Sequence, residues 1–383
     1  MPETSETLSF GDDGVCTVCR QIEFKHEEID WSERGRDLDV LLKEYRGKHK
    51  YDCIVPFSGG KDSTFTLWYL VKEKNLKPLV VRFDHGFYRR TVNDNALRTF
   101  RQLGVDVHQF TPNWQVVRKL MYESLKRRGD FCWHCHTGIF AYPMWVALEK
   151  NVPLLFWGEP DAEYSSFYSY DEEVEHNEHR FNRMVNLGIN AEDMLGMLDD
   201  SISDYEVSER DLKPFTFPPI HDLRRIGPRS VFLGHYIPWD VKKQVQIIKD
   251  ELGWREDEVE GIPPGYGYEK IECFMQGVRD YLKYLKRGFG RTTHLASIDI
   301  RNERLTREEG LELVGKYDGR RPAALDVFLD ILGIDEESFM ELVKPHVVAP
   351  HKMPELGECS RGNLIPHDYD QWWDNLAIKK KTP

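Results

Sequence analysis

The run SGGKDS at residues 58–63 constrains this chain more than any other feature, because it follows directly on the apolar segment 51–57. Two adjacent glycines, Gly59 and Gly60, allow a sharp backbone turn that brings a ligand close to the main chain. Residues 62–75 are predicted to form a helix, whose first turn offers unpaired N–H groups and the positive end of the helix dipole. The run therefore predicts an anion-binding loop between a buried strand and a helix.

The side chains of this loop suit a phosphate ligand. Ser58 and Ser63 offer hydroxyl donors, and Lys61 supplies a positive charge. Asp62 could hold Mg²⁺ through its carboxylate or cap the helix. The structural alternative is a glycine–serine turn that only joins strand to helix. We favour the phosphate loop because the run stands at the first strand-to-helix junction of the alternating region.

Strand-like and helical segments alternate through the first two thirds of the chain, and short apolar strands separated by helices predict parallel pairing. We expect an α/β fold with a doubly wound, mainly parallel sheet. Ligands of such sheets bind outside the carboxyl ends of the strands. The predicted strands are 51–57, 78–84, 105–111, 153–158 and 231–237, and the predicted helices of this region are 33–47, 62–75, 91–103, 113–128 and 136–150.

Three regions are expected. Residues 1–32 form an N-terminal segment with cysteines, and residues 33–240 form the α/β domain. Within that domain, residues 166–228 are charged and irregular and predict an insertion over the active-site face. The pair His176 and His179 in the insertion is better explained by a solvated charged face than by a metal site. Residues 241–383 predict a helical C-terminal region that binds substrate or a partner, with helices near 306–318, 323–332 and 336–344.

The loop is not a Walker A sequence, which requires G-x-x-x-x-G-K-[ST]. It resembles the signature of the PP-loop ATP pyrophosphatases, whose fold is adenine nucleotide alpha hydrolase-like. This resemblance implies that ATP and Mg²⁺ bind at residues 58–63 and that ATP is cleaved between its α and β phosphates. It places adenosine contacts at Asp84 and His85, after the second strand. A plain strand-end turn explains this pair equally well.

The segment after the strand 153–158 also lies on the carboxyl side of the sheet. Gly158 is expected to contact the nucleotide there, and Glu159 is a candidate to bind Mg²⁺ or to orient the nucleophile. A solvated loop carboxylate is an equal alternative for Glu159.

Two C-x-x-C pairs are candidate metal ligands. Cys16 and Cys19 could combine with Cys132 and Cys135 in one tetrahedral zinc site, if folding brings together pairs that lie far apart in sequence. The PP-loop resemblance suggests a second possibility, an iron–sulfur cluster held by Cys132, Cys135 and Cys273. Separate structural cysteines are the third.

A narrower resemblance covers most of the chain. The matching stretches include CWHCHTGIF (132–140), FLGHYIPWD (232–240), DYLKYLKRGFGR (280–291) and ASIDIRNERLTREEGLELVGKYDG (296–319). They are similar to the N-acetyl sugar amidotransferases of bacterial surface-polysaccharide and O-antigen (lipopolysaccharide) biosynthesis. The family implies conversion of an acetamido group to an acetamidino group through an O-adenylyl imidate. Ammonia is then expected from a separate glutaminase and a channel-forming partner, because this chain shows no glutaminase motif.

The same resemblance points to a substrate site and leaves a metal site in question. Arg291, His294 and Arg301 lie in the densest part of the match and could bind the diphosphate or carboxylate of a nucleotide-linked acetamido sugar. Family members also carry a further C-x-x-C before a segment like MPETSE. Here the chain starts at that segment, so residues 1–32 predict only a partial zinc ribbon.

The composition excludes some partners. Lys and Arg total 52 against 65 Asp and Glu, a net charge of −13, which argues against broad nucleic-acid binding. No apolar run approaches the roughly 18 residues that span a bilayer, and the N-terminus lacks the pattern of a signal peptide. We therefore expect a cytoplasmic protein without nucleic-acid or membrane partners.

Two rival functions stay open. A tRNA-thiolating PP-loop enzyme would share the loop and the second cysteine pair, but the acidic charge and the match beyond residue 230 argue against it. A non-catalytic ATP-binding sensor or assembly module would bind ATP without releasing pyrophosphate. The intact Lys61 and Asp62 argue against that module.

Overall fold

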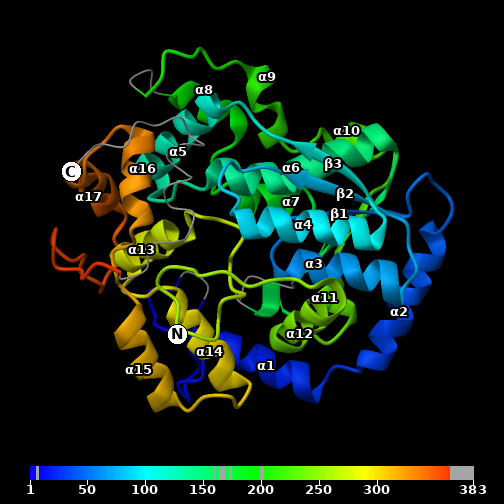
Figure 1. Ribbon diagram of the computed structural model, residues 1–383, viewed down its shortest axis with the longest axis horizontal. Coiled ribbons are helices and arrows are strands. Elements are labelled where there is room, and N and C mark those ends of the chain that lie inside the picture. Colours follow the sequence, from blue (N-terminus) through cyan, green and yellow to red (C-terminus); the bar gives the residue numbers. More distant parts are fainter. Residues whose placement is uncertain (6–7, 159–160, 164–168, 172–174, 199–201, 363–383) are drawn as a thin grey trace.

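The computed structural model describes residues 1–5, 8–158, 161–163, 169–171, 175–198 and 202–362. Its centre is a five-stranded sheet in the order β3-β2-β1-β4-β5, in which every pairing is parallel. The predicted α/β fold with a parallel sheet is therefore confirmed (Figure 1). The strands are β1 (Cys53–Pro56), β2 (Pro78–Phe83), β3 (Asp106–Phe110), β4 (Leu154–Trp157) and β5 (Arg229–Phe232).

Helices cover both faces of this sheet, because successive side chains of a buried strand point to opposite faces. Cys53 and Val55 of β1 belong to one apolar cluster, and Ile54 belongs to another. Helix α6 (Trp133–Lys150) packs in the cluster with Ile54. The other cluster contains side chains of α2 (Trp31–Tyr45), α3 (Lys61–Trp68), α4 (Arg90–Leu103) and α12 (Val241–Leu252).

One predicted strand is partly wrong. The expected strand 231–237 is replaced by β5, which ends at Phe232, and by the single helical turn α11 (Leu233–Tyr236). The Gly234 N–H donates to the Gly158 carbonyl at 3.1 Å, so the chain turns towards β4 instead of continuing the sheet. A short apolar run suits a buried strand and a buried helical turn equally, and the sequence pattern does not separate them.

The C-terminal helices gather to one side of the α/β unit, from yellow to orange in Figure 1. The three of them that begin at Gln276, Ala324 and Glu336 pack on α5 (Trp114–Arg128) in a separate apolar cluster, while the other two pack against each other. The predicted capping box is present, since Thr306 and Glu309 exchange hydrogen bonds at the start of α15. The helices are α13 (Gln276–Arg287), α14 (Arg291–Arg301), α15 (Arg307–Tyr317), α16 (Ala324–Leu332) and α17 (Glu336–Val343).

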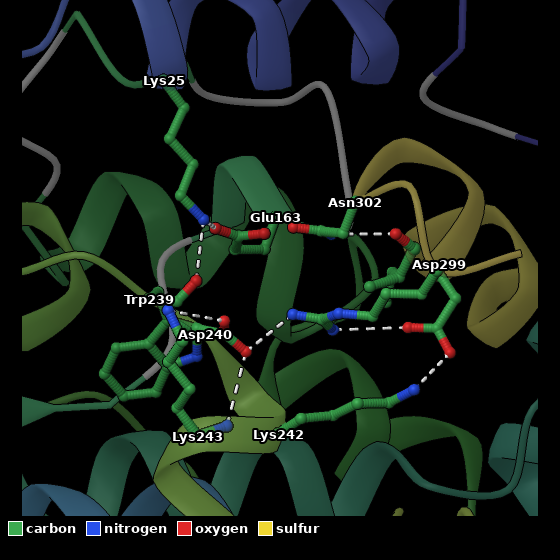
Figure 2. Close-up of polar contacts among 10 residues, drawn as sticks. Lys25, Glu163, Trp239, Asp240, Lys242, Lys243, Asp299 and Asn302 are labelled. Carbon is green, nitrogen blue, oxygen red and sulfur yellow. Dashed lines mark hydrogen bonds and ion pairs between the residues drawn. The ribbon is translucent and has the colours of Figure 1, made fainter.

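Two further regions complete the described chain. The N-terminal segment contains an unpredicted helix, α1 (Thr17–Glu27), whose buried Lys25 forms an ion pair with Glu163 and donates to the Trp239 carbonyl (Figure 2). The described parts of the insertion form short helices, and its turns Phe181–Val185 and Lys213–Phe215 lie against α6. The short helices are α7 (Glu178–Arg180), α8 (Ala191–Met197), α9 (Glu209–Leu212) and α10 (Ile220–Leu223). No helix among the described residues is long and apolar enough to cross a membrane.

Candidate active site

The SGGKDS run forms the tight connection between β1 and α3. Gly59 has φ of +89°, a left-handed conformation that L-residues rarely adopt, and a Cβ there would lie 2.6 Å from Val92 Cγ1. The hydroxyl of Ser63 accepts a hydrogen bond from the Gly59 N–H at 3.1 Å, and that of Ser58 accepts from the Gly60 N–H at 3.3 Å. The loop is thus folded by its own hydroxyls and presents the start of α3 to a ligand.

Lys61, at the start of α3, is buried and carries two carboxylates on its amine. Its Nζ lies 2.8 Å from Asp62 Oδ2 and 3.1 Å from Glu269 Oε2. Burial by itself would raise the pKa of Glu269, but the positive charges of Lys61, Lys270 and Arg291 outweigh it and lower that pKa to about 2. Glu269 is therefore ionised at neutral pH, next to the amine of Lys61.

A cavity of about 260 Å³ opens beside the loop at the carboxyl ends of β1, β2, β4 and β5. This is the edge where ligands of parallel sheets bind. The cavity combines aromatic walls, suited to a planar ring, with hydroxyls and cations, suited to phosphates. Its aromatic residues are Phe57, Phe83, Tyr88, Phe140, Trp157 and Phe232, and its polar side chains are Ser58, Asp62, Ser63, Arg180, Lys270 and Glu272.

Three of these polar residues were missed by sequence reasoning. Arg180 is buried, with its guanidinium 4.7 Å from the centre of the Phe232 ring. Lys270 has φ of +51°, a strained conformation for a residue with a side chain. Glu272 lies against the loop, because a Cβ on Gly60 would come within 2.6 Å of Glu272 Oε2. No motif marks these residues, which come from the insertion and from the segment before α13.

The cavity offers two carboxylates that could hold Mg²⁺. Asp62 and Glu272 both line it, and the buried Oδ1 of Asp62 has no hydrogen-bond partner among the described residues. Mg²⁺ usually binds one or two carboxylates together with substrate phosphates and water, so this pair fits the ion. Glu159, the predicted ligand, lies outside the described residues.

The other predicted nucleotide contacts divide into two groups. Gly158 lines the cavity, and a Cβ there would lie 2.9 Å from Thr66 Oγ1, which accounts for the glycine. Asp84 holds the turn after β2 by accepting from the Gly86 N–H at 2.9 Å. His85 is buried, and burial is the main cause that lowers its pKa to about 3. The role of Asp84 and His85 in adenosine binding stays a prediction.

The four-cysteine zinc site is not formed. Among the residues that the structure describes, no group of three or more His, Cys, Asp or Glu side chains is arranged to hold a metal ion. Cys16 and Cys19 lie 3.4 Å apart, sulfur to sulfur, at the start of α1. Cys132 and Cys135 instead lie at the start of α6, packed into the apolar cluster of α5 and α13. The two pairs therefore lie in different parts of the folded structure.

Cys273 does join the second pair in that apolar cluster, as the iron–sulfur hypothesis requires of a third ligand. The side chains are nevertheless not arranged as a metal site. Burial raises the pKa of both the Cys273 and the Cys135 thiol.

The predicted substrate residues are each engaged in other contacts. Arg291 pairs with Asp280 at 3.2 Å and lies 3.6 Å from Glu269. His294 contacts Lys283, and burial followed by the charge of Lys283 lowers its pKa. Arg301 donates to the Glu163 carbonyl at 3.2 Å. The sugar-binding role of Arg291, His294 and Arg301 stays a prediction.

Comparison with known proteins adds three findings. An uncharacterised protein of Methanocaldococcus jannaschii is 33% identical over 134 residues, which are 35% of this chain and 47% of that protein, so the chain spans about half of its length. The fold is similar to NMN synthetase from Francisella tularensis, with 11% identity, a TM-score of 0.38, and coverage of 76% of this chain and 93% of that one. It is also similar to the U34-tRNA thiolase NcsA from Methanococcus maripaludis with its [4Fe-4S] cluster, with 13% identity, a TM-score of 0.31, and coverage of 92% and 90%. Neither score supports an inference about activity.

A family model matches the C-terminal part of the chain. Residues 266–353 match the family model of the C-terminal domain of WbpG-like LPS biosynthesis proteins. This range contains helices α13–α17. It also contains Glu269 and Glu272, which lie against the loop, and Lys270, which lines the cavity. The chain therefore joins an α/β unit with the SGGKDS loop to a region similar to that C-terminal domain, which is called the WbpG-like domain below.

Proposed function

We propose that this protein is an ATP-dependent amidotransferase that converts the acetamido group of a sugar to an acetamidino group in lipopolysaccharide biosynthesis. The observation that carries the proposal is the contact between two parts of the chain. The WbpG-like domain places Glu269 and Glu272 against the loop, and Lys270 in the cavity beside it, at the carboxyl edge of a parallel sheet. The loop supports the use of ATP, and the domain supports a role in surface-glycan synthesis.

The chemistry requires activation because an amide oxygen is a poor leaving group. The amide oxygen attacks the α-phosphorus of ATP, pyrophosphate leaves, and the amide nitrogen loses its proton. The product of this step is an O-adenylyl imidate. Ammonia then attacks the imidate carbon, and AMP leaves with the former amide oxygen. Oxygen is replaced by NH, so the sugar becomes one mass unit lighter.

The residues of the loop and of the cavity can each be given a role in this reaction. The hydroxyls of Ser58 and Ser63, with the start of α3, would face the phosphates, and Lys61 would balance their charge. Arg180 and Lys270 lie across the cavity, where they can neutralise the pyrophosphate that leaves. Asp62 and Glu272 would hold Mg²⁺, which supplies charge neutralisation for the same phosphates. The buried aromatic walls exclude water, which would otherwise hydrolyse the adenylate.

The acetamido sugar and the source of ammonia complete the proposal. We infer that the substrate is a nucleotide-linked or free acetamido sugar that reaches the cavity from the side of the WbpG-like domain. Ammonia comes from a separate glutaminase, through a channel-forming partner.

The test uses the full chain with ATP, Mg²⁺, ammonium and a panel of acetamido sugars, free and nucleotide-linked. Mass spectrometry should find AMP, pyrophosphate and one sugar product that is one mass unit lighter. A Gly196→Ala variant is a control outside the cavity, since this glycine lies in α8 of the insertion with nothing within 4 Å of its Cβ position. Formation of ADP instead of AMP would sink the mechanism, and ATP binding without pyrophosphate under every substrate condition would favour the non-catalytic module.

A further inference from the structure

Four charged side chains form a chain that leads from the phosphate loop into the WbpG-like domain. Lys61 Nζ lies 3.1 Å from Glu269 Oε2, and Glu269 Oε1 lies 3.6 Å from an Nη atom of Arg291. The other Nη atom of Arg291 lies 3.2 Å from Asp280 on α13. Positive and negative groups alternate along the chain, so each is stabilised by the next.

This chain is withdrawn from solvent. The side chain of Lys61 is 3% exposed and that of Glu269 only 1%, while Arg291 and Asp280 are 12% and 15% exposed. Charges in such surroundings are weakly screened, and removal of one member leaves its neighbour buried without full compensation. The place of Lys61 in the loop therefore depends on residues more than two hundred positions away in sequence.

The backbone that carries Glu269 is held on both sides. Before it, the Tyr266 hydroxyl donates to Asp299 at 2.5 Å, and Asp299 also pairs with Lys242 at 2.6 Å. Figure 2 shows Asp299 and Lys242 pointing toward one another between α14 and α12. After it, the Phe274 N–H donates to the Phe87 carbonyl at 2.9 Å. Glu269 thus approaches Lys61 from a fixed segment.

We propose that Glu269 and Arg291 are positioning residues of the ATP site: Glu269 holds the charged amine of Lys61 in the loop, and Arg291 holds Glu269. This inference rests on the part of the proposed function that assigns ATP to the loop. It gives Arg291 a task different from substrate binding, because its guanidinium lies between two carboxylates of its own domain.

The charge of Glu269 can be tested separately from its packing. Glu269→Gln keeps the size of the side chain and removes one of the two carboxylates on the amine of Lys61. Glu269→Asp keeps the charge and shortens the side chain. If Glu269 holds the amine by its charge, Glu269→Gln should weaken ATP binding more than Glu269→Asp does. If its role were merely structural, the glutamine, which is closer in shape, would be the milder change.

The test is calorimetric binding of a non-hydrolysable ATP analogue with Mg²⁺ to the full chain. No sugar is present, so the result is independent of amidine formation. Glu269→Gln should weaken binding about tenfold. Glu269→Asp keeps the charge and should bind the analogue more tightly than Glu269→Gln. Arg291→Met should weaken binding less than Glu269→Gln.

Glu123→Gln is the control, because Glu123 is a fully buried carboxylate on α5 that pairs with Arg127 and has no part in the contacts described above. It should lower the unfolding temperature as Glu269→Gln does, while analogue affinity stays near that of the unchanged chain. Equal analogue affinity in Glu269→Gln and the unchanged chain would overturn the inference. An equal loss in Glu269→Gln and Glu123→Gln, or weaker binding by Glu269→Asp than by Glu269→Gln, would overturn it too. If the unchanged chain binds the analogue but never forms an amidine, the proposed function fails and the positioning role stands.

Discussion

The two walls of the cavity beside the loop are built in different ways. One wall is local: residues 56–63 are consecutive, and the hydroxyls of Ser58 and Ser63 close the turn. The other wall is assembled from distant parts of the chain, with Arg180 from the insertion and Lys270 and Glu272 from the WbpG-like domain. The comparison teaches that the phosphate-binding shape is encoded in one short run, while the charge of the site depends on the whole fold.

The largest expected effect tests the local wall. Lys61→Ala should lower the rate of AMP formation by about a hundredfold to a thousandfold, because a positioned charge is lost from the phosphates. The measurement is AMP release by chromatography. The change also leaves the buried Glu269 without its nearest cation, so the double variant Lys61→Met with Glu269→Gln is needed as a control. If the double variant is folded and still inactive, the lost charge is the cause. Near-normal AMP release by Lys61→Ala would contradict the assignment of the loop.

The second effect also belongs to the local wall. Gly59→Ala should lower the free energy of unfolding by about 2 kcal/mol, since the new side chain meets Val92 and the left-handed backbone disfavours it. Urea unfolding of both proteins measures the difference. Adding Val92→Ala removes the contact but not the backbone strain. In a chain that already carries Val92→Ala, the loss of stability caused by Gly59→Ala should therefore be smaller but not zero. An unchanged midpoint for Gly59→Ala would show that the left-handed turn is not required.

The assembled wall can be tested through His176, which lies among Phe140, Trp157, Phe181 and Phe217. Burial, followed by the charge of Arg180, lowers the pKa of His176 to about 3 from an ordinary 6.5. Between pH 6.5 and pH 3 the unfolded chain binds a proton at His176 and the folded chain does not. Acidification through this range therefore lowers the free energy of unfolding, which is unaffected by His176 above pH 6.5.

The free energy of unfolding of His176→Phe, minus that of the unchanged chain, should therefore be about 2 kcal/mol larger at pH 5 than at pH 7. Urea unfolding at the two pH values gives this comparison directly, and any cost of repacking cancels in it. A difference that is the same at pH 5 and pH 7 would rule out a neutral buried His176.

The smallest effect concerns Mg²⁺ on the assembled wall. Glu272→Gln should raise the Mg²⁺ concentration needed for half-maximal AMP formation about tenfold, because one of two carboxylates is lost. Saturating Mg²⁺ should restore most of the rate. The control is Glu256→Gln, an acidic residue outside this cavity that pairs with Lys249. An unchanged Mg²⁺ requirement in Glu272→Gln would assign the ion to other residues.

The insertion shows where sequence reasoning failed. Its acidic stretch around His176 and His179 was interpreted as a solvated charged face, yet His176 is buried. Residues 175 and 231 form a bridge at the edge of the sheet, which draws His176 inside. The composition of a segment indicates its average exposure, and only packing decides which of its residues turn inward.

The sequence by itself determined the local features. The order of strands and helices around SGGKDS, the capping box at Thr306 and the left-handed glycine of the loop follow from periodicity and backbone preferences, which act over a few residues. Contacts between distant residues have no such signature. Only the tertiary structure separated Cys16 and Cys19 from Cys132 and Cys135, ended β5 at Phe232, and placed Glu269 beside Lys61. Burial makes that last contact decisive, since a charged amine withdrawn from water needs a partner that the rest of the fold must bring to it.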